Sequence, residues 1–304
     1  MSYELDRRGC AEIALIYDEE SHHVISEAFN QQLFEVFRNY DCDIVGAPIA
    51  RYFHHDMDNP NMPDFKLYIF VNTIYLTDVE REVIRRKLAK NHATALFLYG
   101  AGIMNPDSDP TLDMKHSEAL TGIRMEYTDG VYDGKFKVLG EHPIARTLED
   151  DVLYGAFDRR MQFNSSGYRG KVREIENNLL PLITEDDPEA ETVARFADSG
   201  KPALSVKDLG DFVSIYCGSK YVNNEVVRAV AAFAGCHIWC DTNDVLYANR
   251  SYVVLHAASG GEKVIHLPRP MTATEVYQNK VYAEGASEIR FRLRRGETRM
   301  FRLQ

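Results

Sequence analysis

The sequence lacks any apolar run near the roughly 20 residues that a membrane-spanning helix needs. Its first residues also lack the apolar stretch and the small-residue cleavage site of a secretory signal peptide. These two absences argue against a membrane protein and against a secreted protein. We therefore expect a cytoplasmic chain that has no membrane partner.

Cysteine is scarce, with five residues among 304. An odd number of widely scattered cysteines differs from the dense, even-numbered framework of a disulfide-stabilised secreted domain. Reduced thiols are the expectation. Tryptophan is scarcer still, because Trp239 is the single one, and it cannot by itself form a platform of stacked aromatic rings for a polysaccharide.

Positive charge is in deficit, since 35 Lys and Arg residues face 46 Asp and Glu residues and leave a formal charge of −11. Such a surface repels the phosphates of nucleic acid over most of its area. We therefore expect no nucleic-acid partner.

The first hundred residues contain buried-type apolar runs that alternate with helical patterns. The runs at 12–17, 66–72 and 96–103 predict strands, and the spacing of apolar residues predicts helices over 22–40 and 77–91. The second helix opens on a capping-box pattern at Thr77–Glu80. Continuous apolar strands alternating with helices favour a doubly wound α/β fold with a mostly parallel sheet.

The middle of the chain is less regular. The segment 51–64 holds prolines, asparagines and aspartates and predicts a loop or a broken helix. A helix ending at Gly122 follows. Antiparallel strands are predicted from residue 178 onward, with a turn at 198–200, and a buried strand at 211–217 precedes an amphipathic helix at 223–234 that should close the α/β layer.

The last sixty residues change character. Apolar and polar residues alternate, and Gly-Gly and Arg-Gly-Glu sequences mark turns between the alternating stretches. This pattern predicts a meander of antiparallel strands. We place the boundary near residue 246, which gives an α/β domain over 1–246 and a small antiparallel β domain over 247–304.

Several short segments carry a family resemblance. They are YDEES at 17–21, VNTIYL at 71–76, LYGAG at 98–102, AGCHIW at 234–239, DTNDVLYAN at 241–249 and GEKVIHLP at 261–268. Together they resemble the β-galactosidase trimerisation domain and the short β domain after it. The resemblance implies a class I glutamine-amidotransferase-like, flavodoxin-like fold that follows the catalytic barrel of many microbial glycoside hydrolases. No segment of this sequence resembles that barrel.

The turn after the third predicted strand bears on catalysis. In active class I glutamine amidotransferases this elbow carries a nucleophilic cysteine, whereas here it reads Tyr99, Gly100, Ala101, Gly102, Ile103. None of these residues is an activated nucleophile. We predict that amidotransferase chemistry is absent and that the glycines serve a tight turn.

Open α/β sheets bind ligands at the carboxyl ends of their strands. The candidate ligand-binding residues at that edge are Asp18, Ser21, His22, Asn72, Tyr99, Gly100 and Gly102. A purely structural role competes with this interpretation, since Ser21 is also a good helix N-cap.

Three further clusters have two interpretations each. His54, His55 and Asp56 offer metal or sugar ligands, although adjacent residues rarely face one ion, so a solvated loop is favoured. The segment 236–240 has the residues of a zinc site but is interpreted as a buried core strand. The acidic runs at 149–151 and 185–187 are interpreted as surface charge. No cofactor is predicted.

Two functions remain open. The first is a non-catalytic module that forms a homo-oligomer, a trimer by the resemblance, and shapes a carbohydrate site together with a catalytic barrel domain. The second is a stand-alone hydrolase that uses His22, His54 or His55 with nearby carboxylates at the sheet edge. The missing nucleophile favours the first.

Overall fold

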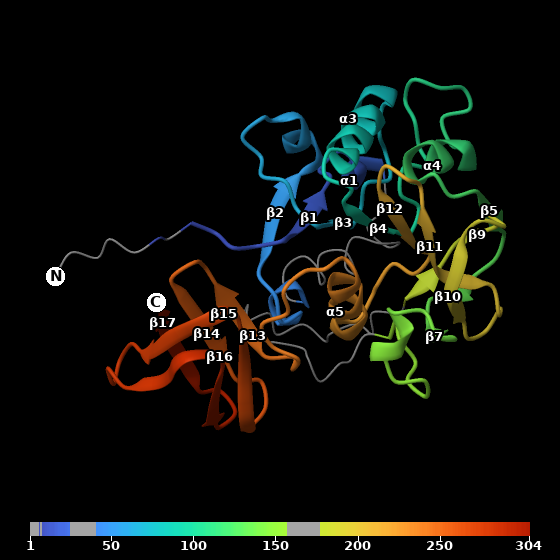
Figure 1. Cartoon of the computed structure of the whole chain (residues 1–304). Helices are drawn as coiled ribbons and strands as arrows, with labels where there is room; N and C mark the ends of the chain where they lie inside the picture. Colours follow the sequence, from blue (N-terminus) through green and yellow to red (C-terminus); the bar gives the residue numbers. More distant parts are fainter. Residues whose placement is uncertain (1–5, 7, 25–40, 157–176) are drawn as a thin grey trace, which may run out of the picture.

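The computed structural model describes residue 6 and residues 8–24, 41–156 and 177–304. Most of the helix predicted over 22–40 lies outside these residues. Within them, the chain forms a mixed eight-stranded sheet covered by helices, a separate five-stranded antiparallel sheet, and two small two-stranded sheets (Figure 1).

Five strands of the large sheet are parallel, as the apolar runs predict. In spatial order they are β2 (Ile49–Phe53), β1 (Ile13–Tyr17), β3 (Leu67–Phe70), β4 (Thr94–Leu98) and β12 (Val213–Cys217). Every residue of β1, β3 and β4 is buried, because layers of structure cover both faces of the sheet. The carboxyl ends of these strands therefore meet at one edge.

The other side of the large sheet is antiparallel, which also confirms the prediction. It consists of β11 (Pro202–Asp208), β10 (Glu191–Phe196) and the short edge strand β7 (Phe136–Val138). The small sheets pair β5 (Met125–Thr128) with β9 (Leu182–Glu185), and β6 (Tyr132–Asp133) with β8 (Asn178–Leu179).

Helices lie on both sides of the large sheet. In Figure 1, α3 (Asp78–Ala89) and α4 (Met114–Thr121) lie on one side and α5 (Asn224–Phe233) on the other. The remaining helical turns are α1 (Ser21–Val24), η2 (Asp41–Ile44), η3 (His54–Asp58) and η4 (Ala145–Thr147). No helix among the described residues has both the length and the apolar character to cross a bilayer.

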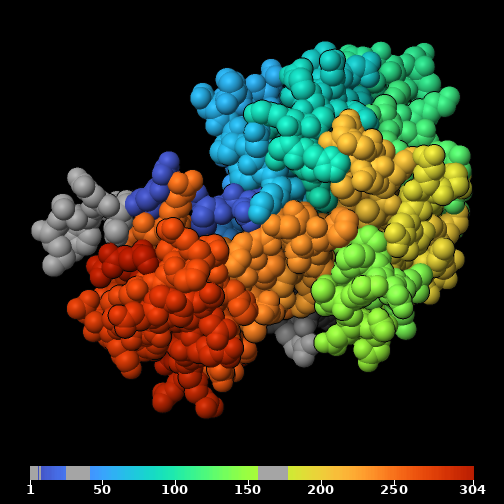
Figure 2. Space-filling model, in the orientation of Figure 1, coloured from blue at the N-terminus to red at the C-terminus, as the bar shows by residue number. Residues whose placement is uncertain are grey.

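The C-terminal sheet forms a lobe beside the α/β layer (Figure 2). It contains β13 (Val245–Ala248), β14 (Tyr252–His256), β15 (Gly261–Glu275), β16 (Val281–Leu293) and β17 (Thr298–Leu303). The strands are antiparallel, but their order is not that of a meander. The last strand, β17, inserts between β14 and β15 and completes the apolar core of the lobe.

One backbone carbonyl joins the lobe to the α/β layer. The Gly46 carbonyl accepts hydrogen bonds from the backbone N–H groups of Trp239 (2.8 Å) and Cys240 (3.1 Å). Gly46 has a φ of +86°, and a Cβ atom there would lie 1.9 Å from the Cys240 carbonyl oxygen. Only glycine fits this position without moving the backbone.

Three further sequence predictions are wrong. Residues 51–53 belong to β2, which the half-exposed composition of this edge strand concealed. Residues 236–240 join neither sheet, and Trp239 and Cys240 are both buried although alternation would place them on opposite faces. Glu185 and Asp187 are buried and bound to neighbouring polar groups, so they are not surface charge; Asp187 pairs with Lys207 at 2.8 Å.

Candidate functional site

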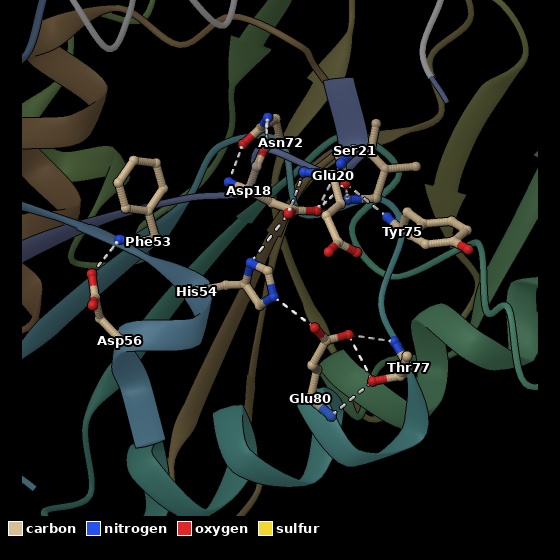
Figure 3. A network of polar contacts seen from close by, with 11 residues as sticks. Asp18, Glu20, Ser21, Phe53, His54, Asp56, Asn72, Tyr75, Thr77 and Glu80 are labelled. Carbon is tan, nitrogen blue, oxygen red and sulfur yellow. Dashed lines mark hydrogen bonds and ion pairs between the residues drawn. The ribbon is translucent and has the colours of Figure 1, made fainter. Parts of the chain in front are cut away.

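Polar side chains follow three neighbouring parallel strands at the point where each strand ends. Asp18 comes directly after β1, His54 directly after β2, and Asn72 two residues after β3. Because these strands are parallel, the three side chains meet at the carboxyl edge of the sheet, where Figure 3 shows them in one network with residues of α1 and α3. This edge is where a ligand site is expected in an open α/β sheet.

Asp18 and Ser21 form the inner part of the network, and both are fully buried. The Asp18 carboxylate accepts hydrogen bonds from the backbone N–H of Glu20 (3.0 Å) and Ser21 (3.1 Å) and from the Ser21 hydroxyl. This is the helix-capping arrangement at the start of α1, with Asp18 supplying the oxygens. The Ser21 hydroxyl oxygen in turn accepts from the backbone N–H of Ile74 (3.0 Å) and Tyr75 (2.9 Å).

Asn72 joins the ends of β1 and β3. Its amide oxygen accepts from the backbone N–H of Asp18 (2.9 Å), and its amide nitrogen donates to the Asp18 carbonyl (2.6 Å). The buried side chain thus replaces a pair of backbone hydrogen bonds where the strand ladder ends. Asp18, Ser21 and Asn72 therefore lie together, as the sequence predicts, but their hydrogen bonds go to each other and to the backbone.

His54 occupies the centre of the network and is 5% exposed. Its Nδ1 lies 3.1 Å from Asp18 Oδ1, and its Nε2 lies 2.8 Å from Glu80 Oε1. Burial by itself lowers the pKa of His54, but the two carboxylates outweigh it and raise that pKa to about 9. His54 is therefore a buried imidazolium ion at neutral pH.

Glu80 has a second role at the start of α3. Its carboxylate accepts from the backbone N–H of Thr77 (2.7 Å) and from the Thr77 hydroxyl (2.7 Å), which completes the predicted capping box. The hydrogen bond with His54 is the main reason that the pKa of Glu80 falls to about 2, and the Thr77 hydrogen bonds add to it. The network thus connects β1, β2, β3 and α3.

The neighbours of His54 do not join this network. The ring of exposed His55 stacks on Phe53 at 5.4 Å, and the carboxylate of Asp56 accepts from the Phe53 backbone N–H. Among the residues that the structure describes, no group of three or more His, Cys, Asp or Glu side chains is placed to hold a metal ion. His22 lies nearby, with its ring 5.0 Å from that of Tyr17.

The glycine turn after β4 lies next to Asn72, since the Gly102 N–H donates to the carbonyl of Thr73 at 2.7 Å. Gly100 and Gly102 both have a positive φ, near +69° and +66°. The Tyr99 hydroxyl donates to the carbonyl of Pro181 at 2.6 Å, and burial raises its pKa. The turn therefore bends sharply at both glycines, and the residue between them, Ala101, is buried.

Sequence reasoning missed one thiol beside this elbow. Cys217 ends β12 in register with Leu98, the residue before Tyr99. Burial raises the pKa of the Cys217 thiol to about 12, so it is protonated at neutral pH and is a poor nucleophile. The sequence places Cys217 at the carboxyl end of a predicted buried strand, and this position was the available signal. That strand, β12, pairs with β4, so the thiol lies beside the elbow.

Comparison with known proteins gives a consistent picture at the level of structure. No family model and no curated protein matches the chain. The solved β-galactosidase from Bacillus circulans sp. alkalophilus matches with a TM-score of 0.64 at 14% identity, over 99% of this chain and 42% of that one. The chain has the fold of one part of a β-galactosidase.

Two further structures agree. The cold-adapted β-galactosidase from Rahnella sp. R3 has a TM-score of 0.60 at 12% identity, over 97% of this chain and 41% of that one. A catalytic mutant of Gan42B, a GH42 β-galactosidase from G. stearothermophilus, has a TM-score of 0.59 at 13% identity, over 98% and 41%. The chain thus spans about two fifths of the length of these proteins, and the likeness is one of fold.

Proposed function

We propose that this chain is a non-catalytic module related to the C-terminal part of β-galactosidase-type glycoside hydrolases. In this proposal the chain associates with copies of itself, as a trimer, and its loops shape a carbohydrate site that a catalytic barrel domain completes. The fold shared with part of several β-galactosidases supports the relationship. The amidotransferase-like character of the α/β layer is part of the same proposal and is supported by the glycine elbow after β4.

The observation that carries the proposal is the absence of a reactive group at that elbow. Ala101 has no nucleophilic group. The Tyr99 hydroxyl donates to a backbone carbonyl, and burial raises the pKa of this phenol. The adjacent Cys217 thiol is fully buried and protonated at neutral pH. Covalent catalysis needs a nucleophile activated by a base or by a lowered pKa, and each of these side chains has the opposite property.

The polar network does not supply a general base either. A base needs a nitrogen or oxygen lone pair that is directed at the substrate, and its pKa should lie near the working pH. Both ring nitrogens of His54 face carboxylates, and its raised pKa keeps both protonated. The Ser21 hydroxyl donates to Asp18 and not to an imidazole, so Ser21, Asp18 and His54 do not form a catalytic triad.

The proposal is tested by assaying the purified chain for hydrolysis of nitrophenyl β-galactosides, nitrophenyl esters and glutamine, with its mass measured by sedimentation velocity. We expect no hydrolysis above the buffer rate and a mass that is a multiple of the monomer mass.

The stand-alone hydrolase is the competing outcome, and histidine variants identify it. Hydrolysis that His54→Gln abolishes and His55→Ala retains, with both variants folded by circular dichroism, would replace the module with an enzyme. His55 is the matched control because it is adjacent in sequence and exposed. A monomeric mass at high protein concentration would contradict the self-association.

A further inference from the structure

A cavity of about 410 Å³ lies where the segment before β13 meets the C-terminal lobe. Its lining includes Trp239, Asn249, Arg269, Met271 and Leu303. Asp6 and Cys10 of the N-terminal segment also line the cavity, which shares no residue with the polar network at the sheet edge. Its volume lies within the range of sites that bind small molecules.

Trp239, the single tryptophan of the chain, is held firmly at this cavity. Its backbone N–H donates to Gly46, its carbonyl accepts from His266, and its ring packs edge-on against His237 at 5.3 Å. The residue is 4% exposed, and its indole N–H donates to no residue in the described part of the chain. The indole nitrogen is not fully enclosed, so this N–H is accessible to solvent and to a ligand in the cavity.

Asn249 supplies a second donor. Its amide oxygen accepts from the backbone N–H of Ser251 (2.9 Å) and Tyr252 (2.8 Å), which fixes the orientation of the amide. The amide nitrogen is left without an acceptor among the described residues. Because the loop backbone binds the amide oxygen of Asn249, the side chain offers a ligand its NH₂ group and not its oxygen.

Arg269 supplies a positive charge. It lies between Pro268 and Pro270, where the pairing of β15 with β16 is interrupted, and the two prolines restrict the backbone there. Arg250, the other arginine of the cavity, forms an ion pair with Asp6 at 3.3 Å, whereas Arg269 has no ion pair with any residue that the structure describes. A guanidinium group in this state matches a carboxylate through two parallel hydrogen bonds.

We propose that this cavity binds a sugar acid, a pyranose ring that carries a carboxylate. The carboxylate pairs with Arg269, and ring and hydroxyl oxygens accept from Trp239 and Asn249. The apolar walls formed by Met271 and Leu303 contact the C–H face of the ring. Three donors without protein acceptors match a ligand rich in acceptors, and the volume is far larger than a bare inorganic anion needs. This inference does not rest on the proposed function.

The single tryptophan makes the test direct. The full chain is titrated with D-galacturonate and D-glucuronate while the emission of Trp239 is recorded, with calorimetry in parallel. D-galactose, D-glucose and inorganic phosphate are the comparison ligands. We expect saturable binding of at least one sugar acid, at least tenfold tighter than binding of its neutral sugar or of phosphate. No saturable signal by either method, or phosphate binding as tight as that of the sugar acids, would overturn the proposal.

Variants assign the binding to this cavity. Arg269→Ala should weaken sugar-acid binding by about tenfold to a hundredfold, the usual effect of losing a hydrogen bond to a charged group. Arg295→Ala is the matched control, because Arg295 is exposed, has no ion pair among the described residues and lies outside the cavity. Trp239→Phe removes the indole N–H and should weaken binding in the calorimeter. Equal affinities for Arg269→Ala and Arg295→Ala would exclude this site.

Discussion

The buried imidazolium of His54 lies between two carboxylates, those of Asp18 after β1 and Glu80 on α3. These two residues are 62 positions apart in the sequence, and the fold brings both to His54. Two carboxylates flank one positive charge, so removing the imidazole leaves Asp18 buried without a counter-ion. Breaking a buried ion pair in this way costs more than the pair contributes when intact, because the remaining charge has lost both water and partner.

The first prediction concerns the pH dependence of stability. The pKa of His54 rises from 6.5 when unfolded to about 9 in the folded chain, so its stabilisation is complete below pH 6.5 and is lost as the pH rises through 9. The pKa of Glu80 falls from 4.5 to about 2, so its contribution is present above pH 4.5 and is lost as the pH falls through 2. We expect His54→Gln to lower the free energy of unfolding by about 3 kcal/mol at pH 6 and by much less at pH 10.

Urea unfolding of the wild type and of His54→Gln at both pH values measures this difference. His55→Ala serves as the control, and its free energy of unfolding should stay close to that of the wild type at each pH. A difference between wild type and His54→Gln that is the same at pH 6 and pH 10 would contradict the buried imidazolium.

The sequence predicts part of this site for a physical reason. Asp18 and Asn72 follow buried apolar runs, and the ends of parallel strands meet at one edge, so their proximity can be predicted. His54 and His55 are adjacent and chemically identical in sequence, and nothing local shows which of them faces the core. That choice depends on Glu80, which packs against His54 only after α3 docks on the sheet.

At the scale of elements, periodicity identified the buried strands of the large sheet well and missed its edge strand β2. β1, β3 and β4 have continuous apolar runs because both faces are covered, whereas β2 is an edge strand and has only intermediate and exposed residues. The insertion of β17 between two earlier strands was also not predictable. Strand order depends on contacts between distant segments, which alternation within one segment does not encode.

The second prediction concerns the junction at Gly46. Gly46→Ala should lower the free energy of unfolding by about 3 kcal/mol or more, because the added Cβ collides with the Cys240 carbonyl and the backbone must move. Gly210→Ala is the matched control: its φ of +83° is similar, but nothing lies within 4 Å of its Cβ position. It should cost only the backbone strain, about 1 kcal/mol. Thermal unfolding of both variants measures the difference, and equal losses would show that the junction tolerates a side chain.

At the scale of the whole molecule, the two parts of the chain carry opposite charge. Residues 247–304 contain 10 Lys and Arg residues and 5 Asp and Glu residues, while residues 1–246 contain 25 and 41. Opposite charges on two parts of one chain favour contacts between the lobe of one copy and the α/β layer of another. This distribution can be counted from the sequence, but the total formal charge of −11 does not show it.

The third prediction follows for the proposed self-association. Sedimentation velocity at about 0.05 M and about 0.5 M NaCl should show a smaller average mass at the higher salt, since screening weakens attraction between exposed charges. Charge reversal by Arg292→Glu with Arg294→Glu should have the same effect at low salt, because Arg292 is exposed on β16 and Arg294 is exposed directly after that strand. An oligomer whose mass is unaffected by salt and by these substitutions would point to an apolar contact instead.

The narrow end of the large sheet limits how copies can meet. β7 has three residues, and Phe136 already exchanges two backbone hydrogen bonds with Tyr154 on its outer side. Among the described residues, an incoming strand would find few vacant amide and carbonyl groups on β7 to extend the sheet. The pairing with Tyr154 thus protects this border against edge-to-edge growth of the sheet from one copy to the next.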